Sequence, residues 1–222
     1  MTKFNIDEWL NIILDKLKYT FKERLIFAGL QGSYNRGEAT DKSDIDLVII
    51  LDELDFEDLK QYRKIIDSMP DKEKACGFIS GKKELKEWSK TDLFQFFYDT
   101  KPLIGNLFDI TEPPSIIDIK TSIKTGLENI YHGASHSYLH SDNHKEDLIN
   151  LYKMTFFILQ AKYFVETNIY VKTKLELAQK LTGIDKDILD ICINKDDILN
   201  KKTEDIEKLY EKLIEWSCLE NK

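Results

Sequence analysis

The chain is poor in arginine, and this scarcity limits what it can bind. Only three of its 222 residues are arginines, namely Arg24, Arg36 and Arg63. The formal net charge is -8, whereas proteins that grip a nucleic-acid backbone usually present a basic surface. We therefore expect neither duplex DNA nor long single-stranded nucleic acid among its partners.

Cysteine and long apolar runs are also scarce. Three widely spaced cysteines fit neither a disulfide framework nor a zinc ribbon. The first residues lack the apolar core of a signal peptide, and no window of about 20 residues is free of charge. With 42% hydrophobic and 32% charged residues, the composition predicts a globular, soluble protein of the cytoplasm, with no membrane partner.

The first half of the chain alternates between helical and strand-like patterns. Apolar residues recur at helical spacing in two segments, and four short apolar runs resemble strands. The predicted helices cover 7–22 and 55–68, and the predicted strands cover 24–31, 46–51, 75–80 and 93–98. The segment from Gly32 to Ser43 contains two glycines and an asparagine, which predicts a functional loop between the first two strands.

Beyond Pro113-Pro114 nearly every segment has the pattern of a helix. We predict helices over 115–140, 145–167, 173–182, 185–194 and 203–219. The second of these is apolar almost all round, which is typical of the central helix of a bundle. The predicted domains are residues 1–112, an α/β (α+β) domain, and residues 113–222, an all-α helical bundle.

The segment Gly32-Ser33-Tyr34-Asn35-Arg36-Gly37 is the first part of a candidate site. A Gly-Ser turn after a strand offers backbone N–H groups and a hydroxyl to phosphate oxygens. The second part is Ser43-Asp44-Ile45-Asp46, at the start of the apolar run 47–51. Strand side chains alternate with a period of two, so the two carboxylates project from the same face and could share one metal ion. A phosphate site next to a metal site suggests phosphoryl chemistry.

This arrangement of strand, Gly32-Ser33, loop and Asp44-x-Asp46 resembles the signature of the DNA polymerase beta-like nucleotidyltransferases. It looks most like the small bacterial members, which include the minimal and the aminoglycoside nucleotidyltransferases. The resemblance implies a catalytic domain with a small mixed sheet. It also implies that Asp44 and Asp46 hold two Mg²⁺ ions and that an NTP such as ATP is the substrate.

The resemblance further implies roles for the neighbouring residues. Gly32 and Ser33 would bind the triphosphate, Arg36 and Lys42 would neutralise its outer phosphates, and Ser43 would shape the mouth of the carboxylate strand. An acceptor hydroxyl would attack the α-phosphorus and release pyrophosphate.

Active members of the family usually add a third carboxylate from a neighbouring strand. The predicted strand 75–80 contains no acid, whereas Glu73 lies just before it and Asp99 lies just after the predicted strand 93–98. We favour Asp99 as the third catalytic carboxylate and leave Glu73 as the alternative.

All four histidines of the chain recur every four residues, at His132, His136, His140 and His144. The first three share a helix face that points away from the predicted bundle core. This face is a solvated surface, a set of substrate contacts or a transition-metal site, and the sequence leaves these three possibilities open.

The function predicted from these patterns is metal-dependent transfer of an NMP to a hydroxyl of a small molecule. An aminoglycoside-like antibiotic is favoured, because an acidic protein suits a cationic substrate, and the protein would then confer antibiotic resistance. One alternative is AMPylation of a protein, as in minimal nucleotidyltransferases of toxin-antitoxin systems, and another is a catalytically weakened nucleotide sensor. The C-terminal domain is not expected to be a nuclease, since no arginine follows Arg63.

Overall fold

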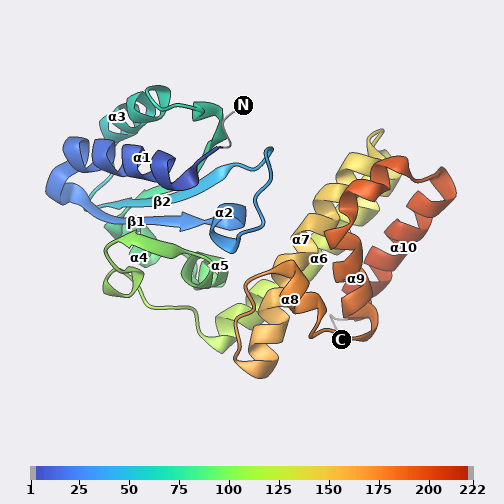
Figure 1. Cartoon of the computed structure of the whole chain (residues 1–222). Coiled ribbons are helices and arrows are strands. Elements are labelled where there is room, and N and C mark those ends of the chain that lie inside the picture. Colours follow the sequence, from blue (N-terminus) through green and yellow to red (C-terminus); the bar gives the residue numbers. More distant parts are fainter. Residues whose placement is uncertain (1–3, 220–222) are drawn as a thin grey trace. The chain divides into compact units, whose positions relative to one another are not determined.

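The computed structural model describes residues 4–219. The chain divides into two compact units, Met1–Pro113 and Pro114–Lys222 (Figure 1). Each unit has buried apolar clusters formed by its own residues. The assignment of separate functional domains to residues 1–112 and 113–222 stays a prediction.

The first unit is built on a four-stranded mixed sheet with the order β3-β2-β1-β4. Strand β1 pairs antiparallel with β2 and with β4, whereas β2 and β3 are parallel. The small mixed sheet expected from the sequence is therefore confirmed. The strands are β1 (Leu25–Gln31), β2 (Ile45–Leu51), β3 (Ala75–Gly81) and β4 (Lys101–Ile104).

Helices cover both faces of this sheet (Figure 1). Helices α1 (Ile6–Phe21) and α3 (Phe56–Asp67) pack on the face that receives Ile45 and Leu47 of β2. Helices α4 (Lys82–Glu87) and α5 (Leu93–Tyr98) pack on the face that receives Val48. Strand β2 is thus buried on both faces, which explains why its sequence is a continuous apolar run.

The prediction of a strand over 93–98 is wrong, because this segment is helix α5. Its buried residues are Leu93, Phe94, Phe96 and Phe97, a spacing that places them on one side of a helix. Aromatic residues are frequent in strands, but here packing against the sheet decides the conformation. The fourth strand is β4, which follows after two residues; with four residues, one of them a proline, it is too short to be recognised from the sequence.

The described residues of the first unit also contain four 3₁₀-helical turns. They are η1 (Lys22–Arg24), η2 (Lys72–Lys74), η3 (Lys90–Asp92) and η4 (Leu107–Asp109).

The second unit is helical throughout its described part, residues 114–219, as the sequence predicts. Helix α6 begins directly after Pro114, where Ser115 and Asp118 form a capping box that satisfies the first backbone N–H groups. The helices are α6 (Ile116–His140), α7 (His144–Thr167), α8 (Lys174–Ala178), α9 (Gly183–Ile193) and α10 (Thr203–Leu219), with the 3₁₀ helix η5 (Lys195–Asn200) between the last two.

Helix α7 is the central helix of this unit. It packs against α6, α9, η5 and α10, and residues on different sides of it, such as Tyr152, Ile158 and Phe164, are buried. No helix among residues 4–219 combines the length and the apolar character that crossing a bilayer requires.

Candidate functional site

The Gly-Ser motif forms the first turn after strand β1. Residues Gly32–Arg36 make a five-residue helix, α2, within the segment that the sequence predicts as a functional loop. Gly32 has φ +74°, a conformation that glycine adopts without strain. Gly37 ends the helix with φ +74° and donates its N–H to the carbonyl of Tyr34 at 3.3 Å. A helical turn forms here because glycines stand at both of its ends, where the backbone needs positive φ.

Asp46 lies directly against this turn. It is paired with Gln31 in the β1–β2 ladder, so the residue after Gln31 passes beside its carboxylate. A Cβ atom placed on Gly32 would lie 1.9 Å from the Oδ2 atom of Asp46. Gly32 thus provides clearance for the Asp46 carboxylate, and the two halves of the sequence motif are in contact.

Asp44 and Asp46 lie at the start of β2. Asp44 is exposed, one residue before the strand, and Asp46 is its second residue and is half-buried. By alternation they share the face of Val48 and Ile50, on which α5 packs. Carboxylate oxygens are the ligands that Mg²⁺ prefers in proteins. Two carboxylates on one face, next to a glycine that leaves room beside one of them, fit a divalent cation of this kind.

Asp99 is buried next to the same turn. It follows the last residue of α5, and its Oδ2 atom accepts a hydrogen bond from the backbone N–H of Gly32 at 3.2 Å. The same atom pairs with the guanidinium of Arg36. The backbone carbonyl of Asp99 accepts a hydrogen bond from the Asn35 side chain at 2.6 Å. The structure therefore brings Asp99 to the Gly-Ser turn, although its role as the third catalytic carboxylate stays a prediction.

Arg36 is enclosed by protein groups. Its side chain is only 7% exposed, and it pairs with Asp99 and, at 3.1 Å, with Glu38. The guanidinium is thus held between two carboxylates. Contact of Arg36 with a nucleotide phosphate stays a prediction.

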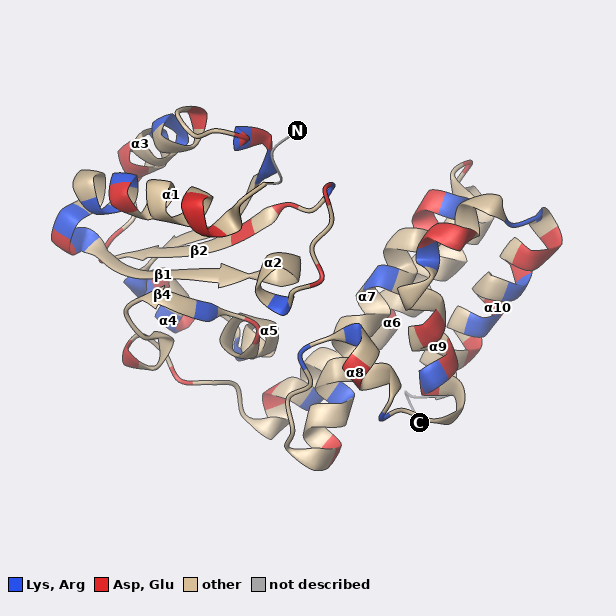
Figure 2. Ribbon diagram, in the orientation of Figure 1, with Lys and Arg blue, Asp and Glu red and all other residues tan. Residues whose placement is uncertain are grey.

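The segment between α2 and β2 contains the other two predicted phosphate-site residues. Lys42 is exposed near its tip, and the hydroxyl of Ser43 accepts a hydrogen bond from the backbone N–H of Thr40 at 2.9 Å. Figure 2 shows that acidic positions outnumber basic ones along this segment and at the start of β2. The role of Ser43 at the mouth of the carboxylate strand, like that of Lys42 at the phosphates, stays a prediction.

Strand β3 places a thiol, not an acid, beside the carboxylates. Cys76 is the in-register partner of Asp46 in the parallel β2–β3 ladder, and it is exposed. Glu73, the alternative third carboxylate, is exposed in the 3₁₀ helix η2 that precedes β3. Its role also stays a prediction.

Two tyrosines near the motif have raised pKa values. Burial, followed by the negative charges of Asp41 and Asp71, raises the pKa of Tyr34 above its usual value. Burial also raises the pKa of Tyr62 to about 12, with a smaller contribution from Cys76. Both phenols are therefore neutral near pH 7, and neither supplies a negative charge to a metal ion.

The histidines of α6 are exposed, as the sequence predicts. The ring centroids of His132 and His136 are 5.9 Å apart, and those of His136 and His140 are 5.1 Å apart. His144 instead lies against Tyr210, with 3.4 Å between its Nδ1 atom and the phenol oxygen. Within residues 4–219, no group of three or more His, Cys, Asp or Glu side chains is arranged to hold a metal ion. This region does not present a three-ligand transition-metal site, and substrate contacts by the exposed histidines stay a prediction.

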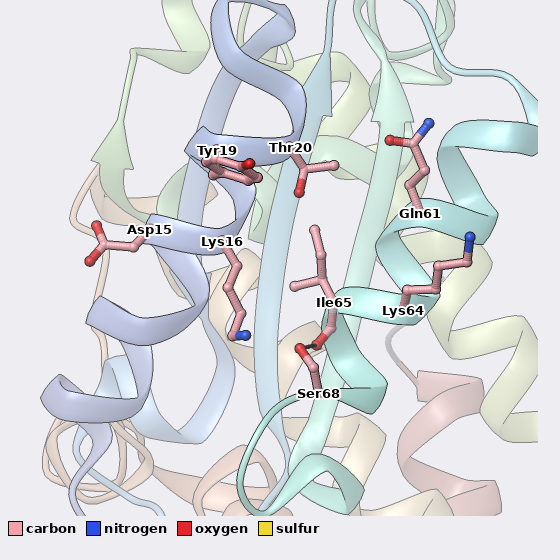
Figure 3. A pocket seen from close by; sticks show the side chains of 8 residues that line it. All are labelled: Asp15, Lys16, Tyr19, Thr20, Gln61, Lys64, Ile65 and Ser68. Carbon is pink, nitrogen blue, oxygen red and sulfur yellow. Dashed lines mark hydrogen bonds between the residues drawn. The ribbon is translucent and has the colours of Figure 1, made fainter.

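Two surface hollows lie apart from the motif, one in each unit. A groove of about 650 Å³ lies between α1 and α3 (Figure 3). Its lining residues are Asp15, Lys16, Tyr19, Thr20, Gln61, Lys64, Ile65 and Ser68. In the second unit a hollow of about 550 Å³ is lined by Tyr138, Glu204, Glu207, Lys208, Tyr210, Glu211 and Ile214. Neither contains a residue that the sequence assigned to the nucleotide or metal site.

Sequence reasoning missed three polar contacts around the Gly-Ser turn. The Asn35 side chain donates to the backbone carbonyl of Asp99, and Glu38 accepts from Arg36. Gln31 donates its side-chain N–H to the backbone carbonyl of Gln95 at 3.2 Å. Asn35 lies in the Gly-Ser segment, but its partner Asp99 is 64 residues away. Glu38 is only two residues from its partner Arg36. No local pattern in the sequence links Asn35 to Asp99.

Comparison with known proteins matches the first unit to one family. Residues 10–86 match the family model described as "Nucleotidyltransferase domain". This range contains β1, α2 and β2, and with them the Gly-Ser turn and both aspartates of the motif. No curated protein matches the chain in sequence.

Among solved structures, the fold is similar to a spectinomycin adenyltransferase, AAD(9), from Enterococcus faecialis, whose crystal structure contains ATP and spectinomycin. The match covers 94% of this chain and 99% of that chain, with a TM-score of 0.55 and 14% sequence identity. The likeness in fold therefore extends over both units.

Proposed function

We propose that this chain is a nucleotidyltransferase of the DNA polymerase beta-like superfamily, which transfers a nucleoside monophosphate from an NTP to a hydroxyl of a cationic small molecule. The match of residues 10–86 to a nucleotidyltransferase domain and the similarity in fold to an adenyltransferase support this proposal. The observation that carries this proposal is the contact between Gly32 and the Asp46 carboxylate. It joins a candidate phosphate site and a candidate metal site within one domain.

In this proposal Asp44 and Asp46 hold the divalent metal, which we take to be Mg²⁺ in two copies. Bound Mg²⁺ would neutralise the negative charge of the triphosphate. Ser33, on the first turn of α2, would donate its backbone N–H and hydroxyl to phosphate oxygens, and no hydrogen bond within residues 4–219 involves that hydroxyl. The N–H of Gly32 already bonds to Asp99. The contribution of Gly32 is therefore the space that it leaves for the Asp46 carboxylate.

The reaction would replace a phosphoanhydride bond by a phosphodiester bond, and the acceptor hydroxyl would give up its proton. The acceptor oxygen forms a bond to the α-phosphorus, the bond from that phosphorus to the bridging oxygen of the β-phosphate breaks, and pyrophosphate leaves. Positioning and charge neutralisation would supply most of the rate enhancement, because the protein forms no covalent bond.

Two observations support a cationic small molecule as the acceptor. The net charge of -8 attracts cations. The similar fold is that of an enzyme crystallised with ATP and spectinomycin, so ATP is the NTP that we propose and an aminoglycoside-like antibiotic is the acceptor. The protein would then act in the cytoplasm and confer resistance, in line with its three free thiols.

Transfer of radiolabel tests this proposal. The protein is incubated with each NTP labelled at the α-phosphate, with Mg²⁺, against spectinomycin, other aminoglycosides, a lincosamide and a cell extract that supplies proteins. We expect label from ATP on an aminoglycoside-like molecule. Label that appears only on protein, or on no acceptor although the NTP binds, would refute the small-molecule acceptor.

A further inference from the structure

Three interactions meet at Asp99. Its Oδ2 atom accepts the N–H of Gly32 at 3.2 Å and pairs with Arg36, and its carbonyl accepts the side-chain N–H of Asn35 at 2.6 Å. Arg36 is held on its other side by Glu38 at 3.1 Å. These interactions link Asp99 to the first residue of α2, to its last two residues and, through Arg36, to the segment after it.

Burial makes these interactions strong and specific. The side chains of Arg36 and Asp99 are 7% and 3% exposed. A hydrogen-bonded ion pair with little access to water is screened less than a surface pair. Removal of Arg36 leaves the Asp99 carboxylate buried without this cation, whereas replacement of both residues avoids that cost.

Asp99 is itself held by a rigid part of the fold. Its N–H donates to the carbonyl of Gln95 at 2.8 Å at the end of α5, and the next residue, Thr100, is buried and donates its hydroxyl to the carbonyl of Phe96. Strand β4 begins directly afterwards and pairs with β1. Asp99 therefore lies between two packed elements and can fix the position of a neighbouring segment.

We propose that Asp99 and Arg36 act as a pair of positioning residues that hold the helical turn Gly32–Arg36 in place beside Asp46. On this view Asp99 acts through the Gly-Ser turn, and Arg36 serves the same purpose instead of binding the nucleotide. The kinetic part of the inference rests on the proposed function, because it assumes that Ser33 on this turn binds the triphosphate. The structural part concerns only the order of the turn.

The proposal predicts how the turn responds to loss of the pair. In Asp99→Asn, the amide keeps the size of the side chain but removes one of the two carboxylates that pair with Arg36, and only Glu38 remains. Backbone amides of the segment 31–38 should then exchange with solvent at least about tenfold faster, because the turn opens more often. The matched control is Asp67→Asn, which breaks the exposed ion pair with Lys72 in the same unit. It should leave exchange in this segment unchanged.

Hydrogen exchange followed by mass spectrometry on the full chain decides the structural part, whether or not the protein transfers nucleotides. Faster exchange confined to this segment supports the proposal. Unchanged exchange in Asp99→Asn would overturn it. Should Asp99→Asn fail to fold, Arg36→Lys, which keeps the charge but loses the two-pronged contact, provides the same readout with the same two outcomes.

Steady-state kinetics separate positioning from direct catalysis. A loosened turn should raise the KM for the NTP about tenfold in Asp99→Asn and leave the KM for the acceptor within about twofold, with kcat reduced only several-fold. A metal ligand or general base would instead lose about a thousandfold in kcat at saturating NTP, and that result would overturn the proposal.

A double-mutant cycle tests whether the two residues act as one unit. The double variant Arg36→Gln/Asp99→Asn should lose no more affinity for the NTP than the worse single variant, since the Asp99 carboxylate is no longer buried without Arg36. If Arg36 bound phosphate and Asp99 acted independently, the losses of the single variants would multiply, and this outcome would refute a shared role.

Discussion

At the scale of single residues, Gly32 determines the geometry of the candidate site. Its φ of +74° is strained for any other residue, and a methyl group there would meet the carboxylate of Asp46. The nearest atoms belong to a side chain that can rotate away. A substitution at this position would therefore displace the proposed metal ligand more than it would damage the fold.

We expect Gly32→Ala to lower kcat/KM by about a hundredfold or more, because even a displacement of about 1 Å costs that much in a positioned site. Thermal unfolding should show a loss of only about 1 to 2 kcal/mol, the usual cost of αL strain. Gly37→Ala is the matched control: Gly37 also has φ +74°, but nothing lies within 4 Å of its added Cβ. Equal losses of activity in the two variants would contradict the role given to Gly32.

The sequence and the structure agree best where a residue acts through its neighbours in the chain. The sequence predicts that Gly32 and Asp46 belong to one site, because Gly32 follows the first predicted strand and Asp46 begins the second. The pair of Arg36 and Asp99 could not be, since 63 residues separate them and burial of a charged pair leaves no local pattern. Strand register explains why Cys76 lies beside Asp46, and the sequence alone does not fix that register.

At the scale of elements, one ion pair fastens α3 to the sheet. Arg24, just before β1, donates to both carboxylate oxygens of Asp58 at 2.8 Å, and Asp58 also forms the capping box of α3 with Asp55. The Asp58 side chain is 3% exposed. The hydrogen bonds from Arg24 hold the pKa of Asp58 below its usual value.

A carboxyl group with a lowered pKa in the folded state stabilises the protein at pH values above its unfolded pKa of about 4, and this contribution is lost as the pH falls through the folded pKa. We expect Asp58→Asn to lower the free energy of unfolding at pH 7 by about 2 kcal/mol, the range for hydrogen bonds to charged groups. The difference from the unsubstituted protein should shrink as the pH is lowered below about 4. Urea titrations at pH 7 and pH 3 measure it, and a difference that grows at pH 3 would contradict this account.

The sequence predicts the helices of this chain better than its strands. The long helices of the second unit follow from their apolar stripes. The sequence predicts a strand over Leu93–Tyr98, which is wrong, because five apolar residues in a run of six fit a buried strand as well as a short buried helix. Only its packing against Val48 and Ile50 of β2 distinguishes the two.

At the scale of the whole molecule, each unit has its own core. Two clusters lie on either side of the sheet in the first unit, and the cluster of the second unit includes Tyr152, Phe156 and Trp216. The chain passes from one unit to the other at Pro113 and Pro114. A core of its own is the main requirement for a segment to fold alone.

We therefore expect fragments 1–113 and 114–222, expressed separately, each to unfold in a single cooperative transition. Circular dichroism during thermal unfolding checks this, with the intact chain as the reference. A fragment 114–222 that lacks helical signal at 25 °C would contradict the expectation of an independent helical unit.

The central claim is that Asp44 and Asp46 form the metal and phosphate half of a nucleotidyltransferase site. The most direct measurement is the single-turnover rate of label transfer from α-labelled ATP, with Mg²⁺, in Asp44→Asn and Asp46→Asn, with Asp67→Asn as the control. We predict that each motif variant loses at least about a thousandfold in rate while its thermal unfolding is unchanged, and that the control retains the full rate. Transfer at an undiminished rate in Asp46→Asn would contradict the account.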